Sequence, residues 1–134
     1  MTLFEKIINR EIPAKIIWED EDVIAFLDIS QATQGHTLVV PKQATESVLT
    51  ATPEVVSKVN CTAQMLSLKL METFGATGVN ILTNANEVSG QTVPHYHVHV
   101  IPRYDVDELK FVPLQKNHDL DEVFKIFQEK NVTL

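Results

Sequence analysis

Residues 95–101 alternate histidine with an apolar or aromatic residue, in the order His95, Tyr96, His97, Val98, His99, Val100 and Ile101. A β-strand has a side-chain period of two, so this segment predicts a strand that carries three imidazoles on one face. Three of the five histidines of the chain lie in it. A polar edge strand would not require such strict alternation, so we expect the histidine face to carry chemistry.

Two kinds of chemistry are open to such a face. The first is a metal site, because histidine is the commonest metal ligand. At ~3.3 Å per residue the outer two Cα atoms lie about 13 Å apart, so one ion would use a pair such as His97 and His99 with a distant third ligand. The second is catalysis, in which the middle residue His97 attacks while its neighbours handle protons and loop amides hold an anion.

Composition indicates one globular domain. The chain has 134 residues, 44% of them hydrophobic, and its net charge is −7. This balance lacks the basic surface of a nucleic-acid binder, and no apolar run approaches the ~20 residues of a membrane span. A lone Cys61 and a start without the pattern of a signal peptide predict a cytoplasmic protein that binds neither nucleic acid nor membrane.

Short strands and a few helices alternate along the chain. Apolar spacing predicts helices over residues 4–8, 53–74 and 119–130. The long one begins at Thr52-Pro53, ends at Gly75 and holds Cys61 as a buried or half-buried thiol. Strands are expected at residues 16–18, 23–27, 36–40, 78–83 and 93–101, with a turn-rich loop at 84–90. This pattern favours an α+β fold with an antiparallel sheet.

The segment His95–Ile101 resembles the defining motif of the histidine-triad (HIT) family, His-φ-His-φ-His-φ-φ with φ apolar, at every position. Upstream blocks resemble the segments that lead to the triad in small members, namely Phe4–Ile8, Glu11–Lys15, Ala25–Ser30, Gly35–Lys42 and Gly90–Pro94. The resemblance covers residues 3–104 and leaves 105–134 as the variable part of a single domain, 1–134. It implies a five-stranded antiparallel sheet with a long helix and a short N-terminal helix, and a sheet that continues across a homodimer.

The resemblance also implies a role for individual residues. His97 would attack the α-phosphorus of a nucleotide to form a nucleotidyl-histidine, His99 would lie by the phosphate and leaving group, and His95 would orient His97. His36 matches a fourth histidine behind the triad, and Asp28 matches an acid that binds the ribose hydroxyls. The base would lie in an apolar slot of Phe4, Ile7, Phe26, Ile29 and Leu38, and the α-phosphate near Asn84, Gly90, Gln91 and Thr92.

The implied activity is hydrolysis or transfer on nucleoside 5′-phosphoramidates or related adenylates, with a purine nucleotide as the ligand. Two alternatives stay open. Pro102-Arg103 after the triad suggests a dinucleoside polyphosphate hydrolase, and the third possibility is a purine-nucleotide-binding regulatory protein whose hydrolysis is incidental. Lys42 and Arg103 are candidates for local positive charge.

No cofactor is expected. Many small relatives hold a structural zinc ion with a Cys-x-x-Cys near the start and a histidine after the Pro-Lys pair. Thr2 and Glu5 stand in the first two places here, and Gln43, Ala44 and Thr45 follow Lys42. Soft ligands are missing from both halves of that site, so we expect no metal.

Overall fold

The computed structural model describes residues 1–115 and 117–130, and its first two helices begin at side-chain caps. In α1 (Leu3–Ile8) the Thr2 hydroxyl accepts the Glu5 N–H at 3.2 Å, and the Glu5 carboxylate accepts the Thr2 N–H at 3.1 Å. This capping box satisfies two backbone donors at once. In α2 (Pro53–Phe74) the Thr52 hydroxyl accepts the Val55 N–H, and the helix ends at Gly75 with a left-handed φ of 76°. The predicted long helix and its two ends are confirmed.

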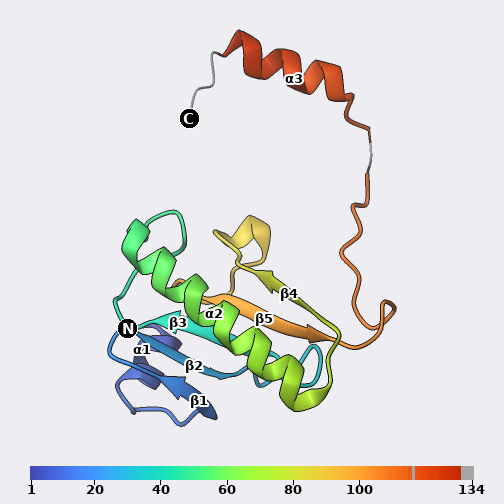
Figure 1. Ribbon diagram of the computed structural model, residues 1–134. Coiled ribbons are helices and arrows are strands. Elements are labelled where there is room, and N and C mark those ends of the chain that lie inside the picture. The colour runs from blue at the N-terminus through green and yellow to red at the C-terminus, as the bar shows by residue number, and fades with distance from the viewer. Residues whose placement is uncertain (116, 131–134) are drawn as a thin grey trace.

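Five strands form one antiparallel sheet in the order β1–β2–β3–β5–β4 (Figure 1). They are β1 (Ile16–Glu19), β2 (Val23–Leu27), β3 (Thr37–Pro41), β4 (Gly78–Leu82) and β5 (Val98–Arg103). The predicted α+β fold and antiparallel sheet are confirmed. Because β5 lies between β3 and β4, the histidine-rich segment does not enter the sheet as a polar edge strand.

The histidine-rich strand begins later than predicted, at Val98 instead of Val93. Val98 is the first residue of the segment that pairs with β3, opposite Val39. Just before it, Pro94 has no N–H to donate, and the His95 N–H bends back to the Val93 carbonyl at 2.9 Å. His95 and His97 therefore lie in the approach to β5, and only His99 lies within the strand.

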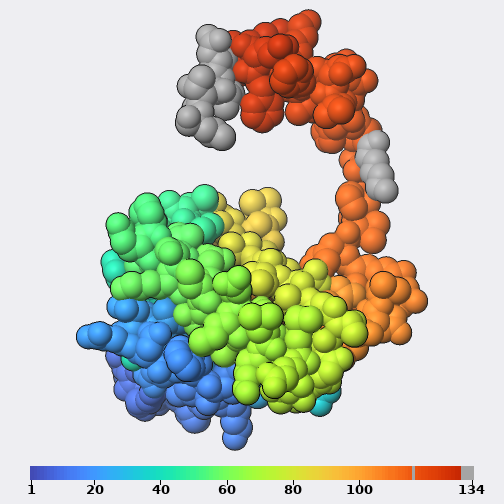
Figure 2. Space-filling model, viewed as in Figure 1, coloured from blue at the N-terminus to red at the C-terminus, as the bar shows by residue number. Residues whose placement is uncertain are grey.

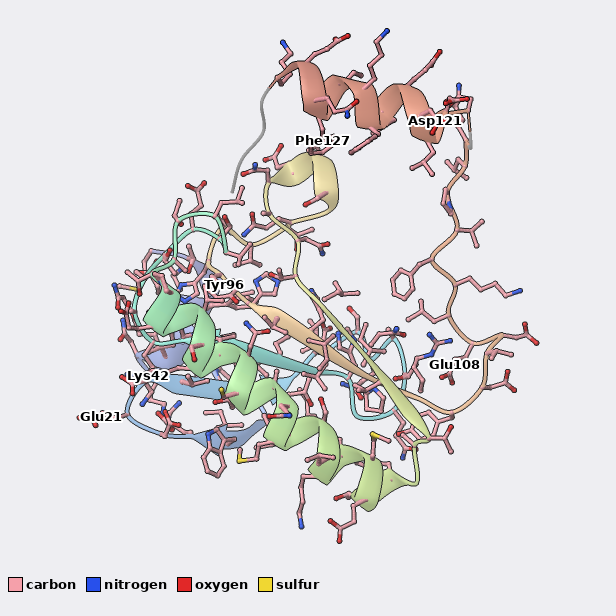
Figure 3. All side chains as sticks on the ribbon, turned by 45° about the horizontal axis from the view of Figure 1, so that its top comes forward. Glu21, Lys42, Tyr96, Glu108, Asp121 and Phe127 are labelled. Carbon is pink, nitrogen blue, oxygen red and sulfur yellow. The ribbon has the colours of Figure 1, made fainter. Side chains whose placement is uncertain are left out.

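The alternation of side chains nevertheless continues through this approach. Tyr96, Val98 and Val100 pack into the core on the side of the sheet that α2 covers, with its residues Val59, Ala63, Leu66 and Leu70. The Tyr96 hydroxyl accepts a hydrogen bond from Asn60 of α2 at 3.3 Å (Figure 3), and burial raises the pKa of this phenol. The histidines face the other way, as predicted.

The opposite face of the sheet carries the second core cluster, which α1 covers (Figure 1). Phe4 and Ile7 of α1 pack there with Ile24, Phe26, Leu38 and Val40. Alternate residues of β2 thus serve the two clusters, as the period of a strand requires. The face with α1 is also the histidine face, since the Phe4 ring lies 6.3 Å from the His95 ring and 4.8 Å from the His97 ring.

Cys61 is exposed, which corrects the prediction of a buried or half-buried thiol. It lies on the outer side of α2, while Val59, Ala63 and Leu66 point toward the sheet. Helical spacing in the sequence identifies the residues on each side of α2, but it does not show which side packs against the sheet and which stays exposed. Within the described residues, we find no helix whose length and apolar character would suit a membrane crossing.

After β5, the described residues include a last helix, α3 (Leu120–Glu129), close to the predicted bounds. The Asp119 carboxylate caps this helix by accepting the N–H groups of Asp121 and Glu122. Figures 1 and 2 show α3 standing apart from the rest of the molecule. We call residues 105–130 the C-terminal arm and residues 1–104 the body.

Candidate active site

A cavity of about 740 Å³ opens on the face of the sheet that carries α1 and the histidines. Apolar side chains of α1, β2 and β3 form one wall, among them Phe4, Ile7, Phe26 and Leu38. Polar groups line the cavity beside this wall, namely Asp28, Thr92, His97 and His99. A volume of this size is typical of sites for small molecules, and its lining joins an apolar slot to two imidazoles.

His97 presents one unpaired ring nitrogen to this cavity. Its Nδ1 lies 2.7 Å from the His95 carbonyl oxygen, and because a carbonyl can only accept, Nδ1 carries the hydrogen. The lone pair is therefore on Nε2. Burial lowers the pKa of His97 below its ordinary 6.5, and the hydrogen bond to His95 opposes this only in part. The ring is neutral at neutral pH, the form that a nucleophile requires.

His95 lies behind His97 and is buried with 1% of its surface exposed. Its Nε2 donates to the Pro41 carbonyl at 2.8 Å, which ties the approach segment to the end of β3. His95 is not among the residues that line the cavity. Its side chain thus holds the backbone whose carbonyl orients His97.

His99 is supported from behind by His36, which lies 63 residues earlier in the chain. The Ala32 N–H donates to His36 Nδ1 at 3.1 Å, so the hydrogen of the neutral His36 ring is on Nε2. That Nε2 donates to His99 Nδ1 at 2.9 Å. The neutral His99 ring therefore keeps its own hydrogen on Nε2. This chain of bonds fixes the tautomers of both rings.

The surroundings of His36, His97 and His99 favour their neutral rings. Burial first, and then the proximity of His97 and His36, lower the pKa of His99 to about 4. Burial also lowers the pKa of His36, although Asp28 lies 3.6 Å away and favours the charged form. The rings of His97 and His99 are 5.1 Å apart, so charging one would disfavour charging the other.

Asp28, His36 and His99 also bring three potential ligand atoms within 4.8 Å of one another. This set differs from the pair His97 and His99 that the sequence suggested for a metal. The Ala32 N–H occupies the lone pair of His36 Nδ1, and His36 Nε2 carries the hydrogen. The contacts are those of a hydrogen-bonded chain, and a metal at Nε2 would have to displace that hydrogen.

The loop between β4 and β5 adjoins the polar lining of the cavity. It contains the 3₁₀ turn η1 (Glu87–Ser89), which ends at Gly90 with a left-handed φ of 105°. Gln91 is buried, and its side-chain amide donates to the Glu46 and Val93 carbonyls and accepts the Asn86 N–H. Gln91 thus shapes the loop. Of the four residues expected near the α-phosphate, Thr92 lines the cavity, whereas Asn84, Gly90 and Gln91 are not among the lining residues.

The residues expected to bind the ribose and the base lie in the same region. Asp28 follows β2 and accepts the Ser30 N–H at 2.7 Å, and both residues line the cavity. Ile29 between them also lines it but is fully exposed, so it lies at the mouth. Lys15 lines the cavity too, and sequence reasoning missed it, although it closes the block Glu11–Lys15 quoted for the resemblance.

The two candidates for local positive charge lie away from the cavity. Lys42 pairs with Glu19 at 2.8 Å and lies near the β1–β2 turn that carries Glu21 (Figure 3). Arg103 pairs with Glu108 at 3.1 Å and donates to Asn80 at 2.6 Å. Each finds an oxygen partner close by, which explains why neither reaches the histidine face.

Comparison with known proteins identifies the family. Residues 9–106 match the model of the HIT domain. The chain is 45% identical over 130 residues to the HIT-like protein MJ0866 of Methanocaldococcus jannaschii, which covers 93% of this chain and 97% of that protein. A HIT family member from Bacillus subtilis has a crystal structure that superposes with a TM-score of 0.86 at 36% identity, over 99% of this chain and 98% of that one. The crystal structure of a HIT family protein from Bacillus anthracis superposes with a TM-score of 0.85 at 36% identity, over 98% of this chain and 96% of that one. This chain is a member of the HIT family.

Proposed function

We propose that the protein is a nucleotidyl hydrolase or transferase that acts on nucleoside 5′-phosphoramidates or related adenylates. The observation that carries this proposal is the His97 ring, whose Nε2 lone pair is free beside a cavity with an apolar slot. Relatives support a nucleotide ligand. A Candida albicans structure described as a histidine triad nucleotide-binding protein is 25% identical with a TM-score of 0.83. An Arabidopsis thaliana protein named adenylylsulfatase HINT3 is 30% identical over 118 residues, although the chain covers only 60% of it.

The nucleotide would span the cavity from its apolar wall to its histidines. A purine base fits the slot of Phe4, Ile7, Phe26, Leu38 and, at the mouth, Ile29. The Asp28 carboxylate, an acceptor with two oxygens, would bind the ribose hydroxyls. The α-phosphate would then lie by His97, His99 and Thr92, next to the loop that contains Asn84, Gly90 and Gln91.

In the first chemical step, His97 Nε2 attacks the α-phosphorus and a P–N bond forms. The bond from phosphorus to the leaving nitrogen or oxygen breaks, the His99 Nε2–H donates a hydrogen bond to the departing atom, and a water molecule gives that atom its proton and becomes hydroxide. The His97 ring becomes cationic, and the His95 carbonyl stabilises it through the Nδ1–H bond already present. In the second step, a water molecule attacks phosphorus and gives a proton to that hydroxide. The P–N bond to His97 Nε2 breaks, which releases the nucleoside monophosphate and restores the neutral His97 ring.

A dinucleoside polyphosphate hydrolase is less well supported by the site. The sequence suggested it through Pro102-Arg103, but the Arg103 guanidinium is bonded to Asn80, Glu108 and the Leu109 carbonyl. It is therefore not available to an extended phosphate chain. A regulatory protein that only binds purine nucleotides would not need the tautomer control found at His97 and His99.

We also infer a cytoplasmic homodimer. Among residues 1–115 and 117–130, β4 pairs with β5 on one side only, and its Ile81 is exposed on the outer strand of the sheet. On the outer side of α2, Met65 is 40% exposed and Leu68 is 68% exposed, next to the exposed Cys61. A free strand edge and an apolar helix face are surfaces that a second copy can cover about a two-fold axis.

A substrate panel tests the proposed activity. The rate constant kcat/KM is measured for adenosine phosphoramidate, an acyl-adenylate and a dinucleoside polyphosphate, with the His97→Asn protein as the control. We expect kcat/KM for the phosphoramidate and the acyl-adenylate to exceed that for the dinucleoside polyphosphate by at least tenfold. The His97→Asn control should be inactive on all three substrates. A preference for the polyphosphate would favour the second enzyme, and negligible rates with intact nucleotide binding would favour the regulatory protein.

A further inference from the structure

The C-terminal arm carries an apolar surface that the described residues of its own chain leave uncovered. Leu120, Val123, Phe124 and Phe127 recur at helical spacing along one side of α3, and all ten residues of the helix are exposed. Phe124 is 60% exposed and Phe127, labelled in Figure 3, is 53% exposed. The arm exposes Phe111, Val112 and Leu114 as well. A run of large apolar side chains of this kind marks a surface that binds a partner.

The helix itself also requires a partner. α3 has ten residues, and isolated helices shorter than about 12–15 residues are only marginally stable in water. An amphipathic helix of this length is normally held by packing of its apolar side. The solved structures from Bacillus subtilis and Bacillus anthracis match 99% and 98% of this chain, shares that include the arm. The arm is thus a regular part of the fold in these relatives.

Arg103 determines where the arm leaves the body. Its guanidinium donates to Asn80 in β4 at 2.6 Å, and to the Leu109 carbonyl in the arm at 2.8 Å. The first residues of the arm are therefore attached beside β4, the strand with a free edge. From there the arm rises away from the body, and Figure 2 shows that an open space separates α3 from the body even with all atoms drawn.

We propose that a second copy of this chain fills that space and that the two copies exchange their arms. The second copy would cover the β4 edge and the outer side of α2, and the apolar side of each α3 would pack on the body of the other copy. This inference rests on the homodimer proposed above. It is favoured because the arm starts at the same strand edge that the dimer would cover, and a two-fold axis would make the exchange reciprocal.

Photo-crosslinking of the full-length protein tests the exchange. Phe127 is replaced by p-benzoylphenylalanine in one variant and Glu129, on the polar side of α3, is replaced by it in a matched control. The association state of both is first measured by light scattering. After irradiation, we expect the Phe127 variant to give a covalent dimer, with peptides that join residue 127 to residues 1–104 of the other chain. Its yield should exceed that of the control severalfold.

The outcomes separate this proposal from the homodimer. A dimer in light scattering whose residue 127 links only within its own chain, or no better than residue 129, would overturn the exchange and leave the dimer intact. A monomer in light scattering would overturn both. Neither result depends on catalysis, so the proposed activity is tested independently.

Discussion

The Nδ1 of His97 lies 2.7 Å from the carbonyl oxygen of His95, two residues earlier in the chain. The group that fixes the tautomer of the proposed nucleophile is therefore backbone, and no side-chain substitution can remove it. A substitution can, however, displace the His95 carbonyl. The His95 side chain, which donates to the Pro41 carbonyl at 2.8 Å, holds this backbone in place.

His95 should accordingly behave as a positioning residue. We expect His95→Ala to lower kcat by ten- to a hundredfold, because small displacements of a reacting group are costly. His95→Gln should recover much of the loss, since its amide can still donate to Pro41. Steady-state kinetics with adenosine phosphoramidate measures both variants. Equal losses in the two would show that the hydrogen bond to Pro41 does not matter.

His99 should matter in proportion to the difficulty of the leaving group. His99→Asn removes the Nε2–H that would stabilise the departing atom through a hydrogen bond, so turnover should fall by about 10²–10³-fold for a basic amine. A nitrophenolate-like leaving group needs little such stabilisation and should lose much less. The measurement is the slope of log kcat/KM against leaving-group pKa in the variant and in the wild type. Parallel slopes would exclude stabilisation of the leaving group by His99.

The lowered pKa values of His36, His97 and His99 predict a stability that declines in acid. Near pH 6.5 the unfolded chain binds protons that the folded rings take up only at lower pH, at about 4 for His99. The contribution of these histidines to the free energy of unfolding is therefore fully present above about pH 6.5 and falls as pH falls below it. Each histidine can contribute a slope of at most about 1.4 kcal/mol per pH unit.

Urea unfolding of wild-type and His99→Asn protein at pH 7.5, 6.0 and 5.0 isolates the contribution of His99 from that of the carboxylates. We expect the wild type to lose more stability across the series than the variant does. Identical losses would mean that His99 is not held neutral by the fold.

Metal removal should have no effect. Thr2 and Glu5 stand where small relatives carry zinc-binding cysteines, and here their side chains form the capping box of α1. A family member from Mycobacterium smegmatis, 34% identical with a TM-score of 0.78, is described as zinc-bound. We predict that dialysis of this protein against a strong chelator changes neither its melting temperature nor its turnover. One zinc ion per chain by elemental analysis would contradict this.

Local signals predicted much of this fold. The cap at Thr52, the stop at Gly75 and the alternation from His95 onward each depend on near neighbours, and each is found in the structure. The start of β5 was misplaced because it depends on where β3 offers a partner, which no local pattern records.

In the candidate site, too, the features that depend on contacts between distant residues could not be predicted from the sequence. The resemblance brought His36 to the triad, but the Ala32–His36–His99 chain that fixes two tautomers depends on a contact between residues 63 apart in sequence. Arg103 looked like a ligand for phosphate because its partners, among them Asn80 and Glu108, are visible only in three dimensions. The exposure of Cys61 likewise depends on which side of α2 meets the sheet.

The His97→Asn protein should lose turnover by at least about 10³-fold and bind nucleotide nearly as well as the wild type. Asparagine keeps a polar group of similar size but has no attacking nitrogen, so the loss should fall on kcat. Isothermal titration with a nucleoside monophosphate gives the affinity. Turnover close to that of the wild type would refute His97 as the nucleophile and revive a metal site.

The most direct test is to trap the intermediate. Wild-type protein is mixed with substrate labelled in the α-phosphate, quenched within milliseconds, and digested for peptide mapping. We predict label on the peptide that contains His97, in a bond that is labile to acid and stable to base, as expected of a phosphoramidate, and no label in the His97→Asn protein. Two results would contradict the account. One is wild-type protein that turns over all of the substrate but carries no label at any quench time, and the other is label on the His97→Asn protein.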